Sequence, residues 1–439
     1  MASKTKTYIA PFIRHVTTRG YAQAAPVAKK YSRVSHVVQD KVFIAALDNG
    51  APVTRVTIAF KAGSRYEPQT ELGISHVLRS AAGLSTKHAS TFIMARKLAQ
   101  LGASVTASGD REFVYYTLEA TQDTVPAALE MLNKMVCCQE FRPWELIDNE
   151  ARLKFDIAAL PPQIRAVDLL HKAAYRRGLG NSLFISPKRI GKISSESLQH
   201  YSSNFMSSDR CAITVVGDNL EKAQLIAKKL ELTTTDSKMV GDTKYYGGEL
   251  RKEMGGDLAH VAIAVQGAAA GTPDALALAI AAKSLGNGPV TKWGSDNSPL
   301  AKAIGNIGPF AAAGFNVSYS DSGLFGVVLS VPKDEASSAV KVVAGLLKNP
   351  SLSPAAIEAG KKQLKLQVLS EADEGTSIAE SIAAQGFYTG SIKTPSDIAN
   401  DIDGMSSANI TQALHNASKI KMSMGAAGNL AFVPYVDEL

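Results

Sequence analysis

Two stretches of sequence determine the expected fold of this chain: residues 113–132 (FVYYTLEATQDTVPAALEML) and residues 324–343 (LFGVVLSVPKDEASSAVKVV). Each combines an apolar strand, a polar turn and an amphipathic helix in the same order. Leu118 corresponds to Leu329, so the two stretches lie 211 residues apart. A shared register of this kind predicts an internal duplication.

Two more matches occur at the same offset. Leu153 corresponds to Leu364 within two long helical patterns, and Gly217 corresponds to Gly428 near the ends of the two halves. Short apolar runs recur in unrelated proteins, but three matches in one register are hard to attribute to chance. The sequence therefore predicts two homologous domains, as also expected for a chain of 439 residues.

Each half reads as strand, helix, strand, strand, helix, several helices and a last strand. Long helices set apart from one largely antiparallel sheet define an α+β domain. The boundary between the halves is expected where periodicity lapses, in residues 233–248 (TTTDSKMVGDTKYYGG). The predicted divisions are a transit peptide (1–21), a linker (22–35), an N-terminal domain (36–232), a linker (233–246) and a C-terminal domain (247–439).

The first 21 residues have a separate character. They contain Lys4, Lys6, Arg14 and Arg19 but no acidic residue, and the first acid of the chain is Asp40. Apolar residues at positions 9, 12, 13 and 16 form one face of a helix. These features predict a mitochondrial transit peptide, with a basic surface arm as the alternative.

The end of this segment resembles a presequence cleavage site. Arg19 lies three residues before Ala22, and Tyr21 directly precedes it. Cleavage between Tyr21 and Ala22 would change the net charge from 47 − 40 = +7 to 43 − 40 = +3. The high isoelectric point therefore belongs largely to the leader, and the sequence shows no basic stripe with aromatics that would indicate nucleic-acid binding.

Composition excludes two further classes. No stretch supplies the roughly 20 apolar residues that cross a bilayer, so membrane association is expected only through partner subunits. Three cysteines, Cys137, Cys138 and Cys211, form no CxxC pair and predict no metal site built from cysteines.

Residues 73–86 (GISHVLRSAAGLST) follow a strand pair at the place where the zinc proteases of the processing-peptidase and insulysin-like family, peptidase family M16, carry HxxEH. The chain resembles this family throughout. In the motif two histidines bind zinc and the glutamate is the general base. Here His76 matches the first histidine, Arg79 stands for the base and Ser80 for the second histidine, while Asp156 lies where the third ligand is expected. We therefore expect no catalytic residue, no metal, no other cofactor and no proteolysis.

Two kinds of non-catalytic family member fit a mitochondrial chain. The α subunit of the matrix processing peptidase carries a glycine-rich loop, but residues 285–308 have scattered glycines with bulky side chains between them. Residues 316–326 (NVSYSDSGLFG) and 73–90 resemble core subunits of the cytochrome bc1 complex instead. The bc1 resemblance is preferred, and the processing-peptidase α subunit is the alternative.

The resemblance to bc1 core subunits implies a structural role in quinol-to-cytochrome c electron transfer. The implied partners are the related core protein 1, cytochrome b, cytochrome c1, the Rieske iron-sulfur subunit and other bc1 subunits. The implied location is the matrix side of the mitochondrial inner membrane, as a peripheral subunit.

Overall fold

A computed structural model describes residues 34–230, 232–234, 243–286, 298–305 and 307–439. The predicted transit peptide, its cleavage site at Tyr21 and Ala22, and most of both predicted linkers lie outside these residues. The domain boundaries given above therefore stay predictions.

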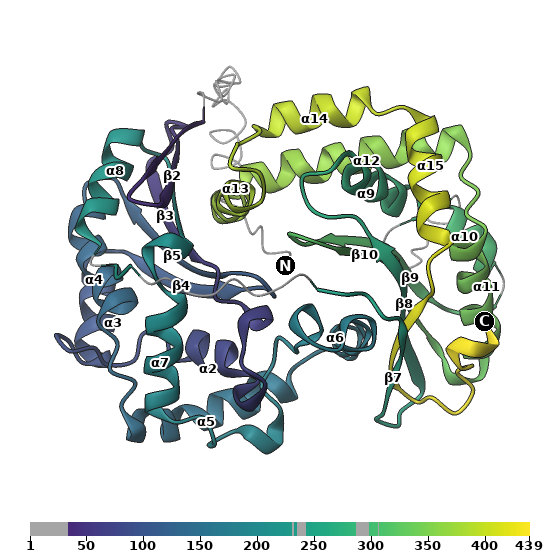
Figure 1. The fold of residues 1–439 in the computed structure, drawn as a ribbon, viewed down its shortest axis with the longest axis horizontal. Coiled ribbons are helices and arrows are strands. Elements are labelled where there is room, and N and C mark those ends of the chain that lie inside the picture. Colours follow the sequence, from purple (N-terminus) through teal and green to yellow (C-terminus); the bar gives the residue numbers. More distant parts are fainter. Residues whose placement is uncertain (1–33, 231, 235–242, 287–297, 306) are drawn as a thin grey trace, which may run out of the picture.

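The first half of the described chain forms a six-stranded sheet with helices around it (Figure 1). The spatial strand order is β1-β2-β6-β3-β5-β4, and β2 and β6 form its parallel pair. Its elements are β1 (Ser35–Gln39), β2 (Val42–Leu47), β3 (Val53–Phe60), α2 (Ile74–Ser80), α3 (Thr91–Gln100), β4 (Ser104–Gly109), β5 (Val114–Thr121), α4 (Val125–Cys137), α5 (Pro143–Ala158), α6 (Pro162–Tyr175), α7 (Ser195–Phe205), β6 (Cys211–Val216) and α8 (Leu220–Lys229).

The second half repeats this plan with a five-stranded sheet in the order β7-β11-β8-β10-β9, in which β7 and β11 are parallel. Its elements are β7 (Gly248–Glu253), β8 (Leu258–Gly267), α9 (Pro273–Leu285), α10 (Pro299–Ile304), β9 (Ala311–Ser318), β10 (Gly323–Pro332), α11 (Ala336–Lys348), α12 (Pro354–Asp373), α13 (Gly375–Thr389), α14 (Pro395–Gly404), α15 (Ser407–Ser418) and β11 (Ser423–Gly428).

The predicted duplication and fold class are confirmed. Leu118 and Leu329 lie on the equivalent strands β5 and β10, and both side chains are fully buried. Gly217 directly follows β6 and Gly428 ends β11, with φ angles of 94° and 110°. Such positive φ values favour glycine, which explains why both halves keep it at this turn.

Both faces of each sheet are covered. All six residues of β2 (VFIAAL) and of β6 (CAITVV) are buried, as expected for strands between two helical layers. On one face of the first sheet lie helices of its own half, including α2, α4 and α7. A helix from the other half covers the opposite face.

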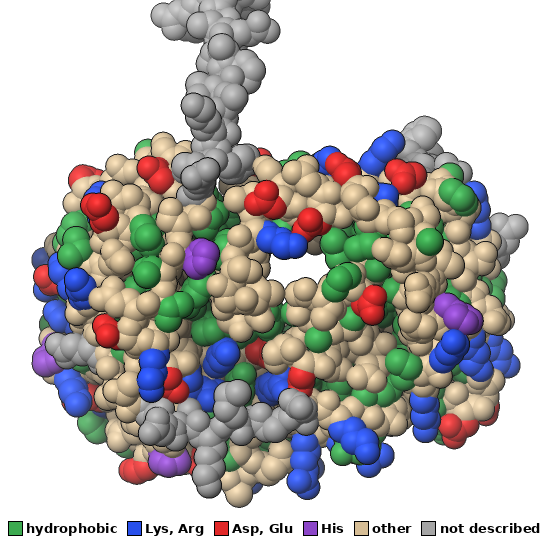
Figure 2. All heavy atoms as spheres, turned by 45° about the horizontal axis from the view of Figure 1, so that its top comes forward, with side chains coloured by type: hydrophobic (Ala, Val, Ile, Leu, Met, Phe, Trp, Pro, Cys, Tyr) green, Lys and Arg blue, Asp and Glu red, His purple; other side chains and the backbone are tan. Residues whose placement is uncertain are grey.

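The two halves exchange one helix each, an arrangement that the sequence did not predict. Helix α13 of the second half places Ile378, Ile382 and Ala383 against the first sheet. Helix α6 of the first half places Leu170 and Ala174 against the second sheet. These helices begin at residues 162 and 375, so they occupy nearly the same place in the duplication. In Figure 1 both lie between the two halves, and Figure 2 shows an opening near the middle of the molecule.

Close packing at glycine holds α6 on its sheet. A side chain at Gly425 of β11 would place its Cβ 2.2 Å from the carbonyl oxygen of Ala166 and 2.3 Å from the amide nitrogen of Leu170. Only a residue without Cβ permits this approach of helix and strand backbones.

Candidate functional site

Helix α2 carries the positions of the zinc motif, and its start is fixed by a buried carboxylate. Glu67 accepts hydrogen bonds from the backbone N–H groups of Gly73 (2.7 Å) and Ser75 (3.0 Å) and from the Ser75 hydroxyl (2.5 Å). A carboxylate at a helix N-terminus satisfies free N–H groups and favours the helix dipole. Gly73 has φ 96°, and a Cβ there would meet Ile185 at 2.7 Å. The helix therefore packs tightly against the loop at Ile185.

His76 is buried and neutral. Its Nδ1 accepts a hydrogen bond from the Ile185 N–H at 3.2 Å, and the Phe184 ring forms a T-shaped contact with the imidazole. Because Nδ1 accepts, the proton of the neutral ring lies on Nε2, which is 3.7 Å from Oδ2 of Asp156. Burial and the nearby Arg79 cation lower the pKa of His76 to about 4, although Asp156 opposes the shift. The structure thus brings together His76 and Asp156, two of the four predicted motif positions.

Arg79 acts as a cross-link inside the former site. Its guanidinium donates to the backbone carbonyls of Ser75 (3.3 Å), Gly109 (3.1 Å) and Leu183 (2.9 Å). Burial lowers the pKa of Arg79, while the carboxylates of Glu67 and Asp110 counteract that shift. One side chain therefore ties α2 to the end of β4 and to the loop that carries Leu183.

Ser80 is engaged with a residue that the sequence interpretation overlooked. The Ser80 hydroxyl lies 3.0 Å from Nδ2 and 3.2 Å from Oδ1 of Asn149 on α5. Asn149 is buried, and Arg152 donates to the Ser80 carbonyl at 3.3 Å. Only the acidic residues of α5 were candidates in the sequence, so Asn149 was missed. Asn149 lies one helical turn before Leu153, and this spacing could have placed Asn149 on the buried face of the helix.

These residues do not fit a zinc ion. A catalytic zinc site needs three protein ligands of the His, Asp, Glu or Cys type and an open position. Here only His76 and Asp156 approach each other, and a permanent cation stands beside them at Arg79. In the described part of the chain, no three His, Cys, Asp or Glu side chains lie close enough together to hold a metal ion. These residues therefore provide neither a metal-binding site nor a general base for hydrolysis.

A second polar cluster joins the two halves. Glu112 is 1% exposed and accepts hydrogen bonds from Arg65 Nη1 (2.8 Å), Tyr388 Oη (2.8 Å), the Ser320 N–H (3.0 Å) and the Ser320 hydroxyl (2.5 Å). Arg65 continues the cluster with two bonds to Asp321, at 2.7 and 2.5 Å. We call Arg65, Glu112, Ser320, Asp321 and Tyr388 the interhalf cluster.

Residues 110–112 (DRE) are a run of charges before a strand, a pattern that in sequence predicts a solvated turn, and the structure contradicts this prediction. Glu112 and Arg111 are buried, and Arg111 donates to Asp168 at 2.7 Å and to the Leu179 carbonyl at 3.1 Å. Burial raises the pKa of Asp110 to about 6, against hydrogen bonds from the N–H groups of Phe113 and Glu112. The turn at residues 320–323, which reads as an ordinary hairpin turn, supplies the second half's share of the cluster.

Asp321 is ionised, and it accepts hydrogen bonds from both Arg65 and the Thr243 backbone. Burial alone would raise its pKa, but the Arg65 guanidinium and the Thr243 N–H (2.7 Å) hold the pKa below its usual value. Charged, bidentate pairs of this kind are geometrically specific. The cluster therefore fixes how the two halves face each other.

The fold, the duplication and the altered motif agree with known families. Residues 42–186 match the insulinase family, peptidase family M16, and residues 192–364 match the inactive domain of peptidase M16. The chain belongs to the peptidase M16 family, as a member that lacks HxxEH.

Among its relatives, "Cytochrome b-c1 complex subunit 2, mitochondrial" of Rattus norvegicus is 34% identical over 90% of each chain. A "Probable mitochondrial-processing peptidase subunit alpha-1" of Arabidopsis thaliana is 23% identical over 96% of this chain and 87% of its own. The fold also matches a chain in the structure of complex III2 from Candida albicans with Inz-5 bound, at a TM-score of 0.76, 18% identity and coverage of 93% and 98%.

Proposed function

We propose that this chain serves as core subunit 2 of a mitochondrial cytochrome bc1 complex, without catalytic activity of its own. The observation that carries the proposal is the state of the former zinc site. Arg79 and the Ser80–Asn149 pair replace the base and a ligand with contacts that stabilise the fold. The 34% identity with the rat bc1 subunit supports the assignment to a bc1 complex.

In this role the chain supports the subunits that carry out quinol oxidation and cytochrome c reduction. Its partners would be core protein 1, cytochrome b, cytochrome c1, the Rieske iron-sulfur subunit and other bc1 subunits. In the described residues no helix is long and apolar enough to cross a bilayer. We place the chain at the inner membrane through these partners, peripherally and on the matrix side.

The transit peptide belongs to the same proposal. Residues 1–21 contain four basic residues and no acid, and together with the Arg19–Tyr21 pattern this supports import and removal of residues 1–21. Sequencing of the mature N-terminus should begin at Ala22. A mature protein that retains Met1 would contradict import by this route.

Affinity purification from detergent-solubilised mitochondria tests the assembly. We expect the tagged chain to bring down b- and c-type haem, seen in the absorbance spectrum, and a second chain of the M16 family.

The alternative is the non-catalytic α subunit of the processing peptidase, which the weaker 23% relative represents. It predicts a haem-free soluble heterodimer that cleaves presequences and loses this activity with a chelator. Such a result would overturn the bc1 proposal.

A further inference from the structure

Helix α5 has a second face that does not contribute to the former zinc site. Its buried residues, Asn149, Leu153 and Ile157, lie on the side of the helix that packs in the core of the first half, where α5 contacts α2. On the opposite side, large apolar residues are open to solvent: Trp144 is 61% exposed, Ile147 65% and Phe155 71%. Figure 1 shows α5 along the outer margin of the first half, near α7.

These side chains form one stripe. Trp144, Ile147, Ala151, Phe155 and Ala158 follow one another at spacings of 3, 4, 4 and 3 residues, and all five are exposed. Spacings of three and four residues return to the same side of a helix. The stripe extends over about 21 Å at 1.5 Å per residue. We call these five residues the α5 stripe.

The internal duplication provides a control for the α5 stripe. Helix α12 occupies the same place in the second half, and the offset of 211 places Ala355, Glu358, Lys362 and Leu366 at the positions of Trp144, Ile147, Ala151 and Phe155. These four residues are also exposed, but two of them are charged. The fold therefore tolerates charge at these positions, so packing within the chain does not require the apolar side chains of α5.

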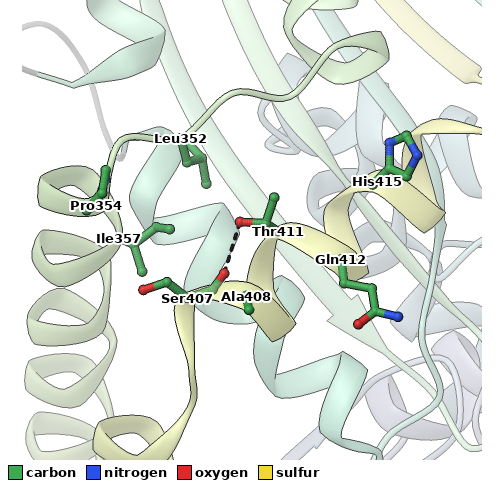
Figure 3. Close-up of a pocket in the computed structure, with 8 residues that line it drawn as sticks. All are labelled: Leu352, Pro354, Ile357, Ser407, Ala408, Thr411, Gln412 and His415. Atoms are coloured by element: carbon green, nitrogen blue, oxygen red, sulfur yellow. Dashed lines mark hydrogen bonds between the residues drawn. The ribbon is translucent and has the colours of Figure 1, made fainter.

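A groove runs beside the α5 stripe. It has a volume of about 370 Å³ and lies between α5, α2 and the start of α7, with Leu146, Leu153, Val77 and Ile193 among its apolar lining residues. Ile147 belongs both to this groove and to the α5 stripe. The second half repeats the groove between α12 and α15, where Ile357 matches Leu146 and Pro354 matches Pro143 (Figure 3).

The charges along the α5 stripe indicate what kind of partner fits. By helical geometry, Asp148 and Arg152 lie along one border of the stripe, and Glu150 and Lys154 lie along the other. Glu150 and Lys154 form an ion pair at 3.1 Å. Each border thus carries one charge of either sign. An anionic lipid surface as the partner would favour an excess of Lys and Arg along the borders of the α5 stripe. A partner helix with charges of both signs at its edges is instead complementary to borders that carry both signs. Aromatic anchors such as Trp144 and Phe155 are also enriched at protein interfaces.

We propose that the α5 stripe and its groove are the docking surface for an amphipathic helix of a different subunit in the assembly. The partner helix carries apolar residues every three or four positions and charges of both signs at its edges. The inference rests on the proposed function in one respect, namely that the chain is a subunit of a larger assembly.

Photo-crosslinking in the purified detergent-solubilised assembly tests the proposal directly. A benzophenone amino acid is introduced at Ile147 or at Phe155, and at Glu358 or Leu366 as matched controls on α12. We expect the α5 positions to crosslink to one helical segment of another subunit, at sites that share a face of that helix. The α12 positions should not reach that segment. Crosslinks to lipid, to a second copy of this chain or to residues 22–33 of the same chain would overturn the proposal, as would the absence of a crosslink.

A substitution that copies the second half separates docking from folding. Ile147→Glu together with Ala151→Lys gives α5 the residues that α12 already carries at Glu358 and Lys362. Thermal unfolding of the isolated chain should stay unchanged, while the yield of the crosslinked subunit in affinity purification falls about ten-fold, as expected for loss of an interface anchor. The reverse exchange, Glu358→Ile with Lys362→Ala, should leave that yield unchanged.

The two proposals can fail separately. If the unaltered chain brings down no haem proteins, the bc1 proposal fails. If haem proteins co-purify and the α5 double variant retains them together with every other subunit, only the α5 proposal fails.

Discussion

His76 and Glu112 are two buried ionisable residues whose surroundings differ in kind. His76 faces an apolar ring, a backbone amide and one carboxylate at 3.7 Å, so its neutral form is favoured. Glu112 is surrounded by four donor groups from both halves. Buried polar groups whose partners are all present favour one arrangement of the chain. Removal of one partner leaves a buried group without a hydrogen bond and lowers the free energy of unfolding.

His76 should make stability depend on pH. Its folded-state pKa of about 4 lies below the ordinary value of 6.5, so between these values only the unfolded chain binds the proton. Its contribution to the free energy of unfolding is therefore present above pH 6.5 and lost as the pH falls to 4, with a full size of about 3 kcal/mol. The variant His76→Gln should lack this loss in denaturant unfolding measured from pH 7 to pH 4. His415→Gln, at an exposed position, is the matched substitution. Parallel pH profiles for the wild type and His76→Gln would contradict the assignment.

Loss of charge at Glu112 should be costly. Glu112→Gln removes the carboxylate that faces the buried Arg65, and breaking a buried pair typically costs about 3 kcal/mol or more. Glu119→Gln breaks a comparable bond to Arg55 at 2.7 Å, but both side chains are partly exposed, so the expected loss is below about 1 kcal/mol. Urea unfolding of the two variants gives the comparison. Equal losses would mean that burial of the interhalf cluster adds nothing.

At the scale of elements, the exchange of α6 and α13 determines the packing. Each helix covers the second face of a sheet that belongs to the other half. Covering both faces explains why every residue of β2 and β6 is buried, without the alternation of a strand that has one solvated face. The exchanged helices lie close to their sheets because glycine occurs at the contact points Gly386, which faces Phe43, and Gly425.

Gly425→Ala tests this packing. The added methyl group would lie within 2.3 Å of the backbone of α6, so helix and strand must separate, at an expected cost of about 2–3 kcal/mol. Gly345→Ala in α11 is the control, because no atom lies within 4 Å of its Cβ position. There alanine should stabilise the helix by up to about 1 kcal/mol. Thermal unfolding separates the two outcomes, and a neutral Gly425→Ala would show that α6 can shift without loss.

The elements that the sequence predicted are those determined by local pattern. The register of 211 identified both copies of the strand and helix around Leu118 and Leu329. The interhalf cluster could not be found in this way, because Glu112 meets Ser320 and Tyr388 only after the halves pack. A short run of charged residues looks the same in sequence whether it is solvated or buried. The helix exchange could not be predicted either, because it also depends on how the two halves pack together.

At the scale of the whole molecule, two similar halves depend on each other. Besides the exchanged helices, the interhalf cluster joins β9–β10 of the second half to Arg65 and Glu112 of the first. His171 and Tyr319 form a further contact at 2.9 Å between the halves. The chain is therefore expected to unfold as one unit, although its sequence divides into two copies.

Separate expression of the halves tests this dependence. A fragment of residues 22–240 would lack α13, and a fragment of residues 241–439 would lack α6, so each sheet would expose an apolar face. We expect each fragment alone to be insoluble or unfolded and co-expression to yield a soluble pair with the circular dichroism of the whole chain. Two fragments that fold independently with sharp thermal transitions would contradict the expectation and would favour autonomous domains with a boundary near residue 240.

The exchanged helix α13 also has a kinetic consequence. A chain that emerges from a ribosome or a translocation pore with its N-terminus first completes the first sheet when β6 ends at Val216, but the helix that covers its inner face begins only at Gly375. Contacts over such a long separation form slowly, and an apolar sheet left open in the meantime invites aggregation. Folding of this protein is thus expected to be late, slow and dependent on chaperones that hold the first sheet until the last quarter of the chain arrives.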